Sequence, residues 1–145
     1  AEVTIADTPL RLLKPQTFMN LSGESIGAAL RYFRIPVAGM LVGYDEIDFE
    51  TGKVRLKFDG GHAGHNGIRN IITHVGSEFW RLRFGVGHPG DRHQVKGHVL
   101  KRATGDEEQL ILASIERGVD ALPTLLRDGP QRAQQELHTE NDSGN

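Results

Sequence analysis

The glycine-rich segment GGHAGHNG, from Gly60 to Gly67, has the residue types and spacing that most directly suggest chemistry. It carries two imidazole groups and one amide on a backbone that is half glycine. Imidazole binds metals or transfers protons, glycine lets a ligand approach the backbone closely, and an amide can bind a carbonyl or a water. The segment is therefore compatible with a zinc site, a phosphate-binding loop or a polar pocket.

A zinc site would need more ligands than this segment supplies. His62 and His65 are three residues apart, the chain has no cysteine, and Asp45, the one suitable carboxylate, lies on a different expected element. Zinc sites in proteins use three or four side-chain ligands. The sequence therefore disfavours a metal site, and we expect no metal or other cofactor.

A phosphate-binding loop is disfavoured by the residues that follow the glycines. The segment GVGHPG, Gly85 to Gly90, matches G-x-G-x-x-G after an expected strand, but Pro89 lies inside it and the next residues do not open an amphipathic helix. Neither glycine segment is followed by the Lys-Ser/Thr pair of a P-loop. A dinucleotide site is therefore not predicted.

A polar pocket fits the position of the first segment, between an alternating strand and a helix start near Gly67. The free N–H groups at such a start attract negative groups. Asn66 occupies the expected N-cap position, so its amide either binds a substrate carbonyl or water, or only caps the helix. The residues leave both interpretations open; in the second, His62 and His65 are solvent-exposed.

The pattern of apolar residues predicts an α/β fold in which strands and helices alternate. Expected strands are 2–7 and 10–14, joined by a turn at Thr8-Pro9, then 39–48, 53–58 and 80–86. Expected helices are Leu21 to Phe33 with Asn20 as N-cap, Gly67 to His74, a long helix from Thr104 that kinks at Pro123 and stops at Gly129, and a short one from Pro130. One domain over 1–138 and a disordered tail over 139–145 are predicted.

Charge is distributed unevenly along a chain of formal net charge -2. From residue 53 to 102 there are ten Lys/Arg and three Asp/Glu, a balance of +7, and from 106 to the end three and nine, a balance of -6. Alternation predicts that one face of the two later strands carries only cations, namely Lys53, Arg55, Lys57, Arg81 and Arg83, which Lys96, Lys101 and Arg102 could extend. Such a face suits the backbone of RNA or DNA, and the alternative is an ordinary solvated surface.

Composition places the chain among soluble globular proteins rather than disordered or membrane-spanning ones. The chain has no cysteine and no N-terminal export signal. These features fit a protein of the reducing cytoplasm.

Four ordered motifs give the sequence a specific likeness to a known family. The segments TFMNLSG, YDEIDF, GGHAGHNGIRNII and RLRFGVGHPG, with the spacing between them, resemble bacterial peptidyl-tRNA hydrolase over nearly all of residues 2–138. The resemblance implies an enzyme that hydrolyses the ester between peptide and tRNA without a metal, recycling tRNA from stalled translation. It also implies a single-domain, mixed twisted β-sheet flanked by helices, and a monomer.

The resemblance also assigns roles to particular residues. It implies that Phe18, Asn20 and Asn66 contact the substrate near the peptide–tRNA junction and that Met19 lines the same pocket. Asp45 would orient a catalytic histidine. Lys57 and Arg83 would clamp a phosphate at the 5′ end of the tRNA, while His62, His65 and the GHPG loop would shape the pocket rim.

One part of the family's pattern does not occur in residues 1–145. In the family, a first strand leads to a Gly-Asn-Pro-Gly loop and then to a Thr-Arg-His-Asn segment whose histidine is the general base; neither segment is found here. We therefore expect the N-terminal segment with the catalytic histidine to be absent from this chain and residues 1–145 alone to be inactive. Two other functions stay open, a non-catalytic RNA-binding module and a phosphate-dependent enzyme, and the motif context disfavours the second.

Overall fold

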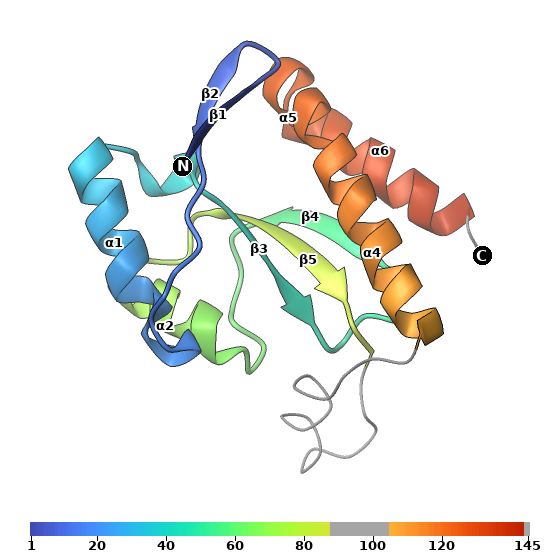
Figure 1. Ribbon diagram of the computed structural model, residues 1–145, viewed down its shortest axis with the longest axis horizontal. Helices are drawn as coiled ribbons and strands as arrows, with labels where there is room; N and C mark the ends of the chain where they lie inside the picture. The colour runs from blue at the N-terminus through green and yellow to red at the C-terminus, as the bar shows by residue number, and fades with distance from the viewer. Residues whose placement is uncertain (88–104, 144–145) are drawn as a thin grey trace. The chain divides into compact units, whose positions relative to one another are not determined.

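The structure, a computed structural model, describes residues 1–87 and 105–143 and confirms the α/β class. Its elements form two compact units, Ala1–Val42 with Phe58–Arg81, and the described part of Gly43–Lys57 with Leu82–Asn145. The strands are β1 (Glu2–Ile5), β2 (Thr8–Arg11), β3 (Leu41–Glu46), β4 (Val54–Phe58) and β5 (Trp80–Gly85) (Figure 1). The helices are α1 (Ser22–Phe33), α2 (Asn66–Val75), α4 (Gly105–Asp120), α5 (Leu122–Asp128) and α6 (Pro130–Ser143), with short 3-10 turns η1 (Met19–Leu21) and η2 (Val37–Gly39).

The main sheet has the strand order β3-β5-β4 and is mixed, as the sequence resemblance implied. The backbone N–H of Trp80 donates to Met40 O and that of Val86 to Glu46 O, at 3.0 and 3.1 Å, so β5 runs parallel to β3. The N–H of Gly85 donates to Lys53 O at 2.7 Å and that of Asp59 to Phe79 O at 3.0 Å, so β4 is antiparallel to β5. The strand order could not be predicted from the sequence.

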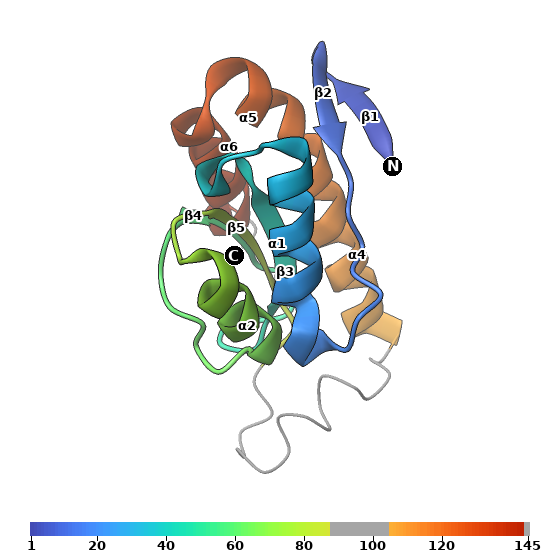
Figure 2. The same ribbon diagram turned by 90° about the vertical axis from the view of Figure 1, so that its left-hand side faces the viewer.

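In the first unit, α1 and α2 pack directly against each other (Figures 1 and 2). Gly23 makes this close approach possible: its N–H donates to Asn70 Oδ1 at 2.7 Å, and a Cβ on Gly23 would lie 2.5 Å from the Asn70 carbonyl oxygen. Ile68 and Ile71 of α2 and Ile26 of α1 are buried. These apolar residues of both helices therefore form part of the core.

The N-terminal hairpin of β1 and β2, drawn in Figure 2, turns two residues earlier than the sequence predicted. Thr8 and Pro9 are paired with Ile5 and Thr4 in β1–β2, and the turn is Ala6-Asp7, with φ angles of 50° and 61°. Two left-handed residues match the twist of a hairpin with a two-residue loop. Pro9 is tolerated here because β1 and β2 form a sheet of two strands. Both are therefore edge strands, where a residue without an N–H is allowed.

In the second unit, α6 covers the edge strand β4. Gln134 Nε2 donates to the Leu56 carbonyl at 3.0 Å, and the Leu56 N–H donates to His138 Nε2 at 3.4 Å. These bonds satisfy backbone groups that an uncovered edge strand would present to other chains. On α4, a Cβ on Gly118 would lie 3.0 Å from the Phe84 ring, so that glycine lets the helix approach β5 closely.

The C-terminal helices differ from the prediction in two details. The expected kink at Pro123 is a break between α4 and α5 at Ala121, while the stop at Gly129 and the restart at Pro130 are confirmed. Helix α6 continues to Ser143, within the span predicted to be a disordered tail. Thr104, the expected cap of the long helix, lies outside the described residues. No helix in the described part of the chain is long and apolar enough to cross a membrane.

Candidate active site

The loop before α2 adopts left-handed backbone conformations that its glycines permit. Gly60 and Gly64 have φ angles of 117° and 83°, and Ala63 has 47°. A turn is closed by the His65 N–H, which donates to the His62 carbonyl at 2.8 Å. The glycines of GGHAGHNG therefore shape the approach to the helix start.

His65, and not Asn66, is the N-cap of α2. The His65 Nδ1 accepts a hydrogen bond from the Ile68 N–H at 3.2 Å, and Asn66 is the first residue of the helix. The prediction that Asn66 caps the helix was therefore wrong. Histidine is not among the preferred N-cap residues, which is why residue type pointed to the neighbouring asparagine. The exposed Asn66 amide is consequently available for another partner.

The structure brings the TFMN motif to the same helix start. The turn η1 packs against α2, and a Cβ on Gly67 would lie 2.6 Å from Met19 Sδ and 3.0 Å from the His65 ring. Only a residue without a side chain allows Met19 this close to the backbone next to Asn66. The predicted pocket residues Met19, His65 and Asn66 are thus neighbours.

The other residues of this motif are exposed beside Met19. Phe18 is 81% exposed and Met19 61%, so both apolar residues are accessible to a ligand. Asn20 lies within η1 and is exposed, and α1 has Leu21 as its N-cap, without a side-chain cap bond. The prediction of Asn20 as a cap was wrong, because η1 precedes the helix.

Asp45 is the penultimate residue of β3 and belongs to the second unit. Its neighbour Glu46 is buried. Because successive strand residues face opposite sides, the Asp45 carboxylate projects from the face opposite Glu46. The Asp45 carboxylate is half-buried at the end of a strand, where it is suitably placed to orient a second polar side chain.

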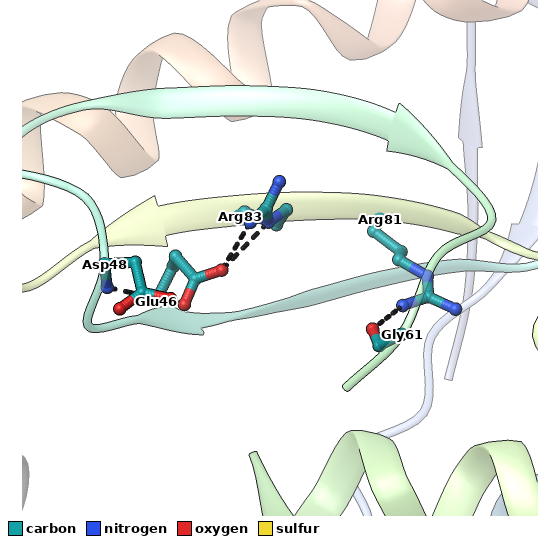
Figure 3. A network of polar contacts seen from close by, with 5 residues as sticks. All are labelled: Glu46, Asp48, Gly61, Arg81 and Arg83. Atoms are coloured by element: carbon teal, nitrogen blue, oxygen red, sulfur yellow. Dashed lines mark hydrogen bonds and ion pairs between the residues drawn. The ribbon is translucent and has the colours of Figure 1, made fainter. Parts of the chain in front are cut away.

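Arg83 on β5 is paired with Glu46 on β3 (Figure 3). Glu46 Oε1 accepts from Arg83 Nη2 at 2.5 Å and from Nε at 3.1 Å, and the two side chains are 5% and 19% exposed. The guanidinium also lies 4.5 Å from the centre of the Phe49 ring. Arg83 is therefore held in one orientation by a carboxylate that sequence reasoning missed, because the pairing depends on the parallel register of β3 and β5.

The two strands do not present all five cations on one exposed face as the sequence predicted. Lys57 is exposed, and the alternation of β4 is confirmed at Val54 and Leu56, which are buried. Arg81, however, is only 1% exposed, and its guanidinium donates to backbone carbonyls. The prediction failed at Arg81 because alternation predicts only the side of the sheet to which a side chain points. It does not predict whether other parts of the chain cover that side. Lys96, Lys101, Arg102 and the GHPG residues after Gly87 lie outside the described residues.

No group of three or more His, Cys, Asp or Glu side chains is placed to hold a metal within residues 1–87 and 105–143. The two loop histidines use a ring nitrogen locally: His62 Nδ1 accepts from the Gly64 N–H at 3.0 Å, and His65 Nδ1 caps α2. Both side chains therefore have a role in holding the loop.

Several known proteins are similar to this chain over most of its length. The family model described as peptidyl-tRNA hydrolase matches residues 1–144. The peptidyl-tRNA hydrolase of Azotobacter vinelandii is 48% identical over 132 residues, covering 90% of this chain and 68% of that protein. The one from Xanthomonas euvesicatoria is 47% identical over 141 residues, covering 97% and 73%. The crystal structure of peptidyl-tRNA hydrolase from Acinetobacter baumannii superposes with a TM-score of 0.91 at 38% identity, covering 94% of this chain and 69% of that one.

The match also bears on the expected absence of an N-terminal segment. The family model is matched from residue 1, so it gives no support to that expectation. Because the model matches nearly the whole chain and the relatives are close to half identical, the chain belongs to the peptidyl-tRNA hydrolase family.

Proposed function

We propose that this protein hydrolyses the ester between peptide and tRNA in peptidyl-tRNA. The observation that carries the proposal is the meeting of η1 and the start of α2, where Asn20 and Asn66 are both exposed and neither caps a helix. Next to them lie the exposed apolar side chains of Phe18 and Met19. Amides beside an apolar surface suit the peptide end of such a substrate, where a carbonyl must be held and a side chain accommodated.

The proposed reaction is attack of water on the ester carbonyl. A histidine removes a proton from the water, the carbon–oxygen bond to the terminal ribose breaks, and free peptide and tRNA are released. Asn66 donates to the carbonyl oxygen as negative charge develops on it. Asp45 accepts a hydrogen bond from the histidine and keeps its other ring nitrogen basic.

Each of the described histidines uses a ring nitrogen in a contact within the fold. Nδ1 of His62 and of His65 accepts from backbone N–H groups, Nδ1 of His74 contacts the Asn70 carbonyl at 3.0 Å, and Nε2 of His138 accepts from the Leu56 N–H. We do not assign the base to any of these four.

The experiment that tests the function is release of an N-blocked amino acid from its tRNA. Hydrolysis faster than the buffer rate supports the proposal. The alternative, a non-catalytic RNA-binding module, predicts saturable tRNA binding with an intact ester. Because the proposed substrate arises in translation, we also propose a cytoplasmic location and, by likeness to the family, action as a monomer.

Lys57→Ala is expected to weaken tRNA binding by about 1–2 kcal/mol and to reduce the salt slope of binding by about one unit. Lys57 is exposed on β4, so its removal deletes a phosphate contact without disturbing the core. Titrations at several salt concentrations measure both quantities. Arg127→Ala, which removes an exposed cation on α5, is the matched control. If Lys57→Ala and the control have the same affinity and salt slope, Lys57 is only a solvated charge.

Arg83→Ala is also expected to weaken tRNA binding, but this substitution leaves Glu46 buried without its cation. Breaking a buried pair from one side costs about 3–5 kcal/mol of folding stability. The double variant Glu46→Gln/Arg83→Ala removes the unpaired charge and isolates the binding effect. If the folded double variant bound tRNA with wild-type affinity, Arg83 would stabilise the fold without contributing to tRNA binding.

Excess chelator is expected to leave peptide release unchanged. The chemistry proposed needs only water, a side-chain base and amide donors, and the loop histidines hold backbone groups. The rate is measured before and after incubation with chelator, then after adding zinc. Loss of activity that zinc restores would instead make His62 and His65 candidate ligands.

A further inference from the structure

Arg81 on β5 is a buried cation whose hydrogen-bond partners are backbone carbonyls. Its Nη1 donates to Gly61 O at 2.6 Å and its Nη2 to Ser77 O at 2.9 Å, and the former contact is drawn in Figure 3. The guanidinium also lies 4.2 Å from the centre of the Phe79 ring. Hydrogen bonds and a ring face must replace the water that a buried guanidinium loses. The position of Arg81 is thereby tied to two points of the backbone.

Gly61 and Ser77 lie on either side of the segment that carries Asn66, whose amide we propose binds the substrate carbonyl. Gly61 lies near the start of the glycine loop, five positions before Asn66, and Ser77 follows α2, which ends at Val75. A single planar group with donors at fixed angles therefore sets the distance between the two ends of the segment. Since it contacts carbonyls rather than side chains, it fixes the path of the backbone itself.

Two glycines of the loop lie without close neighbours on their Cβ side. A Cβ on Gly61 or on Gly64 would have nothing within 4 Å, so the chain there borders open space. The bond from the Gly64 N–H to His62 Nδ1 spans only two residues and does not tie the loop to the sheet. Arg81, in contrast, reaches the loop from β5.

Burying the charged Arg81 side chain in this part of the core is also energetically unfavourable. Its Nε is buried without a hydrogen-bond partner in the described part of the chain. An apolar side chain of similar size would avoid burying a charge and an unpaired donor, and such replacements are often neutral or stabilising. What an apolar side chain could not do is hold the two carbonyls.

We propose that Arg81 is a positioning residue for the reaction, which holds the segment Gly61–Ser77 so that Asn66 stays at the substrate carbonyl. This inference rests on the proposed function. A displacement of about 1 Å in a reacting geometry costs about 10²-fold in rate. Loosening the loop is therefore expected to lower kcat far more than it changes KM, because tRNA contacts elsewhere are retained.

The test compares Arg81→Met and Arg81→Lys with the control Arg69→Met, which removes an exposed arginine from α2. Amide hydrogen exchange over Gly61–Asn66 and in the core of α1 is measured together with kcat and KM. We expect faster exchange in the loop only, a fall in kcat of at least tenfold with Arg81→Met, and KM within about threefold. Arg81→Lys, which can reach one carbonyl at a time, is expected to lie between Arg81→Met and wild type in both readouts.

Loop exchange that stays at the wild-type rate in both variants would overturn the inference, as would a loss of kcat equal to the loss of folded protein. Equal acceleration of exchange in the loop and in α1 would also overturn it, since Arg81 would then serve global stability. If wild-type protein released no peptide at all, the proposed function would fail, and the exchange data would still decide whether Arg81 holds the loop.

Discussion

Asp45→Asn is expected to lower kcat for peptide release by about 10²–10⁴-fold while leaving tRNA affinity unchanged. In the mechanism we propose, the carboxylate accepts a hydrogen bond from the histidine base and thereby keeps the correct ring nitrogen free to take a proton from water. An amide of the same shape offers a donor as well as an acceptor and allows the wrong tautomer. Initial rates at saturating substrate, with binding measured on the same preparations, test this.

Asp48→Asn is the matched control for Asp45→Asn. Asp48 is an exposed carboxylate just beyond β3, so it shares the local charge but not the strand position. We expect its variant to keep kcat within about twofold, as is usual for surface groups outside the machinery. Equal rates for wild type and Asp45→Asn would show that Asp45 does not orient the base.

The second large effect is expected for Asn66→Ala, which should lower kcat by about 10²–10³-fold, the usual effect of removing one donor from a developing oxyanion. Its stability should change by less than about 1 kcal/mol, since His65 and not Asn66 caps α2. Asn20→Ala is expected to act in the same direction, because Asn20 is exposed in η1 and makes no cap bond. Thermal unfolding and initial rates are compared for each variant.

His65→Ala provides the reciprocal control. It removes the Nδ1 acceptor at the start of α2 and is expected to cost about 0.5–2 kcal/mol of stability. Its effect on kcat, measured on folded protein, should be well below that of Asn66→Ala. The opposite pattern, with Asn66→Ala losing mainly stability and His65→Ala mainly activity, would reverse the roles given to these two neighbours.

The sequence predicted the elements well where one local rule decides the outcome. Alternation located β4 and β5, and the 3.6-residue period located α1 and α2, because these patterns follow directly from which face is buried. Gly129 and Pro130 marked the helix boundary correctly, since each residue has a strong backbone preference there.

The failures concern groups whose partners are distant in sequence. Burial of Arg81 depends on the carbonyl of Gly61 in the loop before α2, and the pairing of Arg83 depends on Glu46 of a neighbouring strand. Neither partner can be found without the strand order. The capping error at Asn66 has another cause, because residue preferences at the N-cap are averages that one loop conformation can override.

The measurement that tests the central claim most directly is the time course of ester cleavage with an N-acetylated aminoacyl-tRNA under single-turnover conditions, with tRNA binding followed in the same samples. We expect that the ester is consumed far faster than in buffer, that N-acetylamino acid and intact tRNA appear together, and that Asp45→Asn binds tRNA equally but cleaves slowly. Saturable binding by the wild-type protein with the ester decaying only at the buffer rate would contradict it.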